Sequence, residues 1–210
     1  LLRKYVSPSH PLIRWLFEKY DGVRGFWNPL KKAFYSRFGK KLRMPDHIIY
    51  EMPNDIFLDG ELWYGLDLTE LCFNNFYCNR FGRDRFQEAM KISNRYEGEI
   101  SWGNFKYMVY DIPNDKGTYR ERYTKLGITM LTSFICHLLP ISLEQYLTGP
   151  GRGNKYVTLA PKLICEGPDH VSSLFDEIVS AGGEGIILRD PNAPFTSGRS
   201  QSYLKYKVKY

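Results

Sequence analysis

The run Lys19-Tyr20-Asp21-Gly22-Val23-Arg24 is the most informative stretch of this chain, although alone it is more typical of a surface turn than of a catalytic site. Four more segments follow it within 210 residues. They are Leu58-Asp59-Gly60-Glu61-Leu62, Met108-Val109-Tyr110-Asp111, Glu184-Gly185-Ile186-Ile187-Leu188-Arg189 and Leu204-Lys205-Tyr206-Lys207. Together the five segments contain an amine nucleophile, carboxylates that suit a metal ion, an aromatic ring that suits a base, and cations that suit phosphates.

The composition is that of a globular protein with a basic surface. Hydrophobic residues make up 43% of the chain and charged residues 25%, which is ordinary. The length fits one large domain or two small ones, and we expect residues 1–210 to form a single domain. The net charge of +6 favours a polyanionic partner, although a solvated cationic surface explains it as well.

The cysteines and the hydropathy pattern bear on the compartment. No run of 18 apolar residues occurs, so we expect no transmembrane helix and no membrane partner. Cys72, Cys78, Cys136 and Cys165 form no Cys-x2-Cys pair, and no histidine lies at zinc-ligand spacing from them. They are expected to be buried or free thiols in a reducing, intracellular compartment; nucleus, cytoplasm and nucleoid stay open. Leu1 is not an initiator residue, which suggests a fragment.

The pattern along the chain mixes strands with helices and predicts an α+β fold. Alternation and turn residues predict strands at 57–64, 105–112, 185–189 and 203–210, two short strands within 27–38, and one at 156–165 that Pro161 breaks. Helical spacing of apolar residues predicts helices at 84–96, 119–139 and 170–181. Residues 149–154 are rich in glycine but lack the phosphate-loop pattern, so we expect a connector there.

The chemistry begins with Lys19. An amine that attacks phosphorus must be neutral, and neighbouring cations favour that form. Asp59 and Glu61 lie two residues apart in an expected strand, so both carboxylates should leave the same face. Glu61 and Glu184 could then bind Mg²⁺, which combines carboxylates with substrate phosphates; two solvated acids at a strand end are the alternative.

The last expected strand alternates clearly. Lys205, Lys207 and Lys209 share one face, and such a row can hold phosphates or simply protect an edge strand from aggregation. Tyr110 could stack on a purine or belong to the core. Arg37 could contact a ribose or an end phosphate, or it could be an ordinary surface arginine beside a turn.

In the order and amino-acid sequence of the five segments, the chain resembles the ATP-dependent DNA ligases, part of the covalent nucleotidyltransferase family. The resemblance spans about residues 15–210 and is greatest to minimal bacterial-type ligases. Trp27 after the Lys19 run, the Leu58–Trp63 run and Gly198-Arg199-Ser200 carry this closer likeness. It implies an ATP-grasp-like nucleotidyltransferase fold of two antiparallel sheets flanked by helices, with the nucleotide in a cleft between them.

The same resemblance implies roles for individual residues. Lys19 would carry AMP, and Tyr110 takes the position of the aromatic that stacks on adenine. The remaining implied contacts are Arg24, Arg37, Glu61, Lys205 and Lys207 with the nucleotide, Glu61 and Glu184 with Mg²⁺, and Arg24, Arg37 and Arg199 with DNA. Lys19 would attack ATP, AMP would pass to the 5′-phosphate of nicked double-stranded DNA, and the 3′-hydroxyl would then displace AMP, as needed in DNA repair and replication.

Relatives of the ligases define the alternatives. RNA ligases and mRNA-capping enzymes share the Lys-x-Asp-Gly run, and a non-catalytic nucleic-acid-binding module is a further possibility. Glu184-Gly185, where capping enzymes usually have Asp-Gly, and Leu188-Arg189 favour a DNA ligase. Ligases continue into an OB-fold domain, which we expect to be absent from this chain. We also expect a monomer, and DNA binding that weakens with salt and has little sequence preference.

Overall fold

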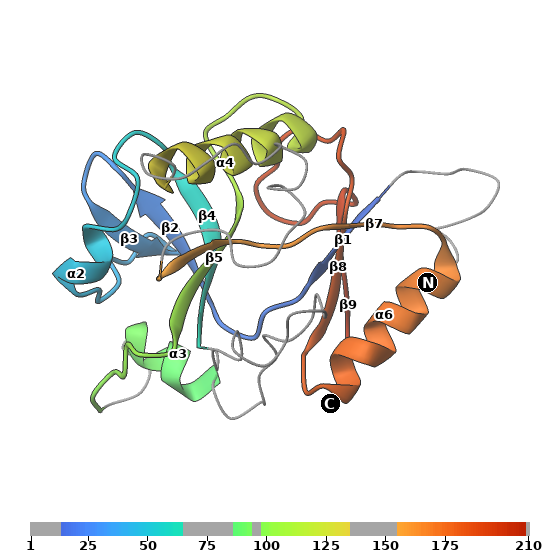
Figure 1. Ribbon diagram of the computed structural model, residues 1–210, viewed down its shortest axis with the longest axis horizontal. Helices are drawn as coiled ribbons and strands as arrows, with labels where there is room; N and C mark the ends of the chain where they lie inside the picture. The colour runs from blue at the N-terminus through green and yellow to red at the C-terminus, as the bar shows by residue number, and fades with distance from the viewer. Residues whose placement is uncertain (1–13, 65–85, 94–97, 135–154, 209–210) are drawn as a thin grey trace.

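The computed structural model describes residues 14–64, 86–93, 98–134 and 155–208. Two sheets stand side by side and share one core region between them (Figure 1). The predicted connector at 149–154, the ends of two predicted helices, Lys209, and the cysteines other than Cys165 lie outside the described residues. Within them Cys165 is a free thiol, and none of their helices is long and apolar enough to cross a membrane.

The first sheet has five strands in the order β3-β2-β4-β5-β6. Its strands are β2 (Val23–Asn28), β3 (Ala33–Ser36), β4 (Leu58–Tyr64), β5 (Phe105–Asp111) and β6 (Val157–Leu159). Three pairs are antiparallel, but β5 and β6 run parallel. The expectation of two antiparallel sheets therefore holds except for this one pair. Helix α4 (Tyr119–Phe134) lies between β5 and β6 in the chain, and such a crossover is what allows a parallel pair.

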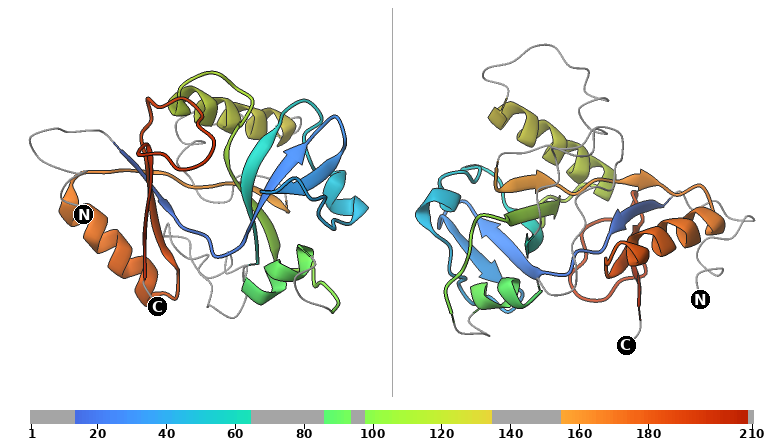
Figure 2. Two further views of the ribbon diagram at one scale, coloured as in Figure 1. Left: turned by 180° about the vertical axis from the view of Figure 1, so that it is seen from behind. Right: turned by 60° about the horizontal axis from the view of Figure 1, so that its bottom comes forward.

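The second sheet has four antiparallel strands in the order β7-β1-β8-β9. They are β1 (Trp15–Glu18), β7 (Leu163–Ile164), β8 (Gly185–Arg189) and β9 (Tyr203–Lys207). Helix α6 (Pro168–Ser180) covers one face (Figure 2). Its Val171, Leu174 and Ile178 pack on Leu16, Ile186 and Leu188 of the sheet, and burial of such side chains stabilises this layer.

Strand β1 is buried on both faces, which explains its continuous apolar sequence. Leu16 faces α6 and belongs to the smaller core cluster. Trp15 and Phe17 face the other way, where both rings pack against Tyr119 and Tyr123 of α4. Because alternate residues of a strand point to opposite faces, this one strand joins α6 to the core that lies between the sheets.

The predicted elements are largely confirmed, and their boundaries differ for local reasons. Helix α6 begins at Pro168 rather than at 170, because proline suits the first helical turn. Gly127 does not interrupt α4, and α3 (Phe86–Ile92) lies inside the predicted range. The short helix α2 (Asp46–Ile49) was not predicted, since four residues are too few to show a helical period.

Candidate active site

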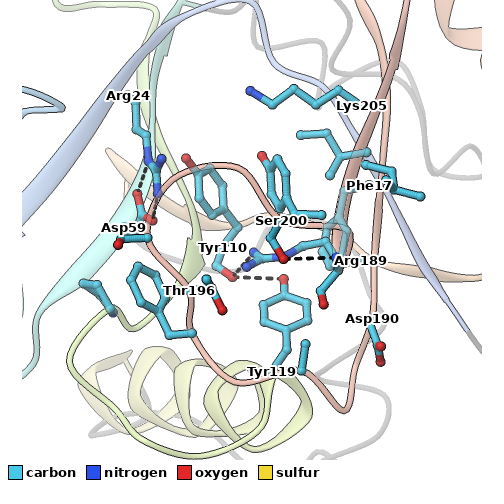
Figure 3. Close-up of a pocket in the computed structure, with 18 of the residues that line it drawn as sticks. Phe17, Arg24, Asp59, Tyr110, Tyr119, Arg189, Asp190, Thr196, Ser200 and Lys205 are labelled. Carbon is cyan, nitrogen blue, oxygen red and sulfur yellow. Dashed lines mark hydrogen bonds and ion pairs between the residues drawn. The ribbon is translucent and has the colours of Figure 1, made fainter.

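A cavity of about 840 Å³ lies between the two sheets. Strands β2, β4 and β5 contribute one wall, and β1, β8 and β9 contribute the other, with the loop from 190 to 202 closing one side. Figure 3 draws Arg24 with Asp59 on one side and Lys205 on the other, with Tyr110 between them. The predicted cleft between the sheets is therefore present, and its lining is dominated by charged and aromatic side chains.

Lys19 lies on the turn between β1 and β2 and is one of the residues that line the cavity. Its backbone N–H donates to the carbonyl of Gly185 at 2.8 Å, and its ammonium contacts the carboxylate of Glu184. The other oxygen of Glu184 lies 3.2 Å from Nζ of Lys207. One largely buried carboxylate therefore contacts one lysine from a turn and one from β9. Burial, together with the charge of Glu184, also raises the pKa of Asp21.

Arg24 and Asp59 form a bidentate ion pair across neighbouring strands. Nε of Arg24 donates to Oδ1 of Asp59 at 2.9 Å, and Nη2 donates to Oδ2 at 2.5 Å. Asp59 is buried, whereas 40% of the Arg24 side chain remains exposed to the cavity. Such a fork-to-carboxylate pair fixes the orientation of the guanidinium, so Arg24 presents its free N–H groups in a set direction.

Glu61 lines the cavity beside Asp59, which confirms that the two carboxylates share a face. Burial raises the pKa of Glu61 to about 8, opposed mainly by the charge of Lys19. Among the described residues, none forms a hydrogen bond or ion pair with the carboxyl group of Glu61, and they contain no group of three potential metal ligands. Two carboxyls around Lys19 fit Mg²⁺, because this ion usually takes one or two carboxylates and completes its shell with phosphates and water.

A buried ionic network lies behind Tyr110 and connects the two sheets. Asp111 on β5 accepts a hydrogen bond from Nε of Arg122 at 2.6 Å and forms an ion pair with Arg189 on β8. Arg189 also donates to the carbonyl of Tyr110 at 3.3 Å, as does the hydroxyl of Tyr119 at 3.0 Å. The backbone that carries Tyr110 is therefore held from both α4 and β8 (Figure 3).

Comparison with known proteins bears directly on this arrangement. The family model of the ATP dependent DNA ligase domain matches residues 13–207. The chain belongs to the ATP-dependent DNA ligase domain family. It is 28% identical to a DNA ligase of Haemophilus influenzae over 209 residues, and it spans 63% of the length of that relative.

Solved structures of ligases share the fold. A Lig E DNA ligase superposes with a TM-score of 0.61 and 18% identity, covering 93% of this chain and 62% of that one. The DNA ligase–adenylate of Chlorella virus superposes with a TM-score of 0.60 and 16% identity, covering 92% of this chain and 62% of the other. The predicted nucleotidyltransferase fold is thus confirmed, and the chain corresponds to somewhat less than two thirds of each of these ligases.

The ligase domain brings most of the predicted site residues to one place. Seven of them line the cavity: Lys19, Arg24, Arg37, Glu61, Tyr110, Arg199 and Lys205. Glu184 and Lys207 are absent from that lining and reach the site through their contacts with Lys19 and with each other. Tyr206 packs on Phe175 of α6 with ring centroids 4.1 Å apart, which confirms that the lysines of β9 occupy the opposite face.

Sequence reasoning missed the partners that position these residues. No local sequence signal indicates that Asp59 pairs with Arg24, because the two residues lie in distant segments. The same is true of the network that Asp111 forms with Arg122 and Arg189. Tyr203 could have been found, since it lies two residues before Lys205 on the same strand face. Tyr203 lines the cavity, and burial raises its pKa to about 12.

Gly185 explains why glycine follows Glu184, and it yields a first prediction. Its φ is +146°, and an added Cβ would lie 2.3 Å from the carbonyl oxygen of Tyr206. Neither the backbone conformation nor the space allows a side chain. We expect Gly185→Ala to lower the free energy of unfolding by roughly 2–4 kcal/mol, measured by urea denaturation. Gly103→Ala is the control, because a Cβ there meets nothing within 4 Å; equal stability of the two variants would contradict this prediction.

Proposed function

We propose that this chain is the adenylation domain of an ATP-dependent DNA ligase. It would transfer AMP from ATP to Lys19 and then to the 5′-phosphate of nicked DNA, for phosphodiester sealing. The observation that carries this proposal is that Lys19 lines one cavity together with Arg24, Glu61, Tyr110 and Lys205, while its ammonium contacts Glu184. A binding module would not need an amine within such a set.

The first step follows from these positions. Nζ of Lys19 would attack the α-phosphorus, so that an N–P bond forms and the bond to pyrophosphate breaks. Tyr110 would stack on the base, while Arg24 and Lys205 would offset the negative charge of the phosphates. The amine of Lys19 contacts Glu184, so this contact must be released before the amine can attack. Mg²⁺ held by Glu61 and Glu184 would supply charge neutralisation at the phosphates and would favour the neutral amine.

The second and third steps concern DNA. The 5′-phosphate of a nick would attack the phosphorus of the AMP group. A phosphoanhydride between the 5′-phosphate and AMP would form, and the N–P bond to Lys19 would break. The 3′-hydroxyl would then attack that 5′-phosphate and release AMP. Arg37 and Arg199 are both exposed residues of the cavity lining, so a phosphate at the entrance could reach them.

The test is covalent labelling. The chain is incubated with Mg²⁺ and ATP labelled at the α-phosphate, separated on a denaturing gel and mapped by mass spectrometry. We expect label on Lys19, none from ATP labelled at the γ-phosphate, and little from labelled GTP. Joining of a nicked DNA duplex, with nicked RNA in parallel, then tests the polynucleotide. Efficient labelling by GTP, or joining of RNA alone, would contradict the proposal.

Removal of the metal gives a second prediction. With EDTA in excess of all divalent ions, we expect labelling of Lys19 to fall to background. No Mg²⁺ would then be held by the two carboxyls to offset the negative charge of the ATP phosphates. Adding Mg²⁺ beyond the chelator should restore the label. Full labelling in EDTA would show that the pair Glu61 and Glu184 does not serve a metal.

A further inference from the structure

Lys205 differs from the other lysines of the site in what holds its side chain. Lys19 and Lys207 both contact the carboxylate of Glu184. Within the part of the chain that the structure describes, the ammonium of Lys205 has no hydrogen bond and no ion pair. It lies instead over the ring of Tyr203, with Nζ 5.5 Å from the ring centroid. An aromatic ring therefore has the position that a carboxylate has beside the other two lysines.

A ring and a carboxylate act differently on the cation that they hold. A carboxylate neutralises an ammonium and takes up some of its N–H donors. The face of an aromatic ring attracts a cation through its quadrupole and carries no net charge, so the ammonium keeps its charge and its donors. Burial raises the pKa of Tyr203 to about 12, so its phenol is neutral near pH 7 and is no anionic partner. Lys205 is thus oriented and still able to bind an anion.

The backbone of β9 places the ring and the ammonium on one face. Tyr203 and Lys205 lie two residues apart in this strand, and such residues point to the same side. Both line the cavity, whereas Leu204 between them packs on the smaller core cluster beneath α6. A regular strand therefore suffices to bring the ring next to the lysine.

The ring of Tyr203 is itself held from the neighbouring strand. Arg189 is the residue opposite Tyr203 in the pairing of β8 with β9, and its guanidinium carbon lies 5.0 Å from the ring centroid. Arg189 in turn forms an ion pair with the buried carboxylate of Asp111. A continuous series of contacts, from Asp111 through Arg189 and Tyr203, therefore connects the buried ionic network with Lys205.

We infer that Tyr203 is a positioning residue for nucleotidyl transfer, whose ring aims the ammonium of Lys205 at the phosphates of the nucleotide without neutralising it. This inference rests on the proposed function. Two other roles of Tyr203 would give different results. A ring that contacts the base directly would act independently of Lys205, and a ring that only packs against the main core would change stability rather than rate.

The first test compares rates of Lys19 labelling by Mg²⁺ and ATP labelled at the α-phosphate. Tyr203→Leu removes the ring, and we expect the rate to fall about tenfold, which is the size of a partly desolvated cation–π contact. Tyr203→Phe keeps the ring and should stay within about twofold of the wild-type rate. The matched control is Tyr206→Leu, which removes a ring from the opposite face of the same strand, where it packs on Phe175. That variant should label at the wild-type rate.

A double-mutant cycle then asks whether Tyr203 acts through Lys205. Lys205→Ala alone should slow labelling. Adding Tyr203→Leu to that variant should change the rate by less than about twofold, because the group that the ring orients is already gone. A further tenfold loss would show that Tyr203 acts by itself and would overturn the inference. The same loss in Tyr203→Phe as in Tyr203→Leu, or in Tyr206→Leu, would overturn it as well.

A measurement without nucleotide keeps the inference separate from the proposed function. Lysines are labelled with carbon-13 at Cε, and the Lys205 signal is assigned from its loss in Lys205→Ala. The ring current of an aromatic side chain shifts protons over its face upfield. We therefore expect upfield Cε protons of Lys205 in the wild type and in Tyr203→Phe, and an ordinary position in Tyr203→Leu. An ordinary position in the wild type would overturn the inference. An upfield signal in a protein whose Lys19 takes up no AMP would confirm the contact and count against the proposed function alone.

Discussion

Lys19→Ala is expected to reduce labelling by ATP to below about one thousandth of the wild-type level, because no other amine takes the place of a missing nucleophile. The fold should persist, since Glu184 keeps its contact with Lys207 in that variant. The measurement is incorporation of the α-phosphate label on a denaturing gel, together with the thermal unfolding midpoint. Loss of label with an unchanged midpoint would separate a chemical role of Lys19 from a structural one.

Two further variants sharpen this result. Lys19→Arg keeps a cation beside Glu184, but a guanidinium stays protonated and cannot attack, so it should be equally inactive. Lys125→Ala removes a lysine of α4 whose Nζ lies 3.0 Å from Asp115 and which is not part of the cavity lining. This variant should take up the label normally. Substantial label on either Lys19 variant would refute the assignment of the nucleophile.

Asp111→Ala is expected to lower the free energy of unfolding by about 3–5 kcal/mol. Its carboxylate is fully buried and neutralises two guanidiniums, of which Arg122 is only 1% exposed. Without Asp111, both cations would remain in the interior uncompensated. The measurement is urea denaturation followed by fluorescence. Because Arg189 would also lose the partner that directs it toward the Tyr110 carbonyl, we expect weaker ATP binding at urea concentrations where the variant is still folded.

The matched control is Asp115→Ala. Asp115 also forms an ion pair, with Lys125, but that lysine is 58% exposed. Exposed pairs contribute little, so the cost should be about 1 kcal/mol or less. If the two aspartate variants lost equal stability, the network around Asp111 would not be the link between the sheets that its burial suggests.

Much of the fold was predictable because the patterns are local. The strands at Leu58–Tyr64, Phe105–Asp111 and Gly185–Arg189 show apolar or alternating residues over their full length. The parallel pairing of β5 with β6 was not predictable, since β6 has three residues and its partner is set by where α4 returns the chain.

The candidate site divides in the same way. Residue type and spacing made Lys19, Glu61, Tyr110 and Lys205 candidates, the resemblance to ligases implied their roles, and all four residues line one cavity. The partners of the charged residues could not be identified in this way, because Arg24 pairs with Asp59 on a neighbouring strand and Lys19, on the turn after β1, contacts Glu184 just before β8. Residue type indicates that a cation needs a partner, but only the pairing of strands decides which carboxylate supplies it.

The sequence by itself determined the kinds of element, their order, and the residue types that point to nucleotidyl transfer. These properties depend on backbone preferences and on the period of side chains along a single segment. Tertiary structure alone decided that the lysine of one turn touches Glu184, that Asp111 joins the sheets, and that Phe38 stands exposed beside Arg37. The reason is physical: burial, ion pairing and cavity shape arise between segments far apart in the chain, and local spacing carries no information about those distances.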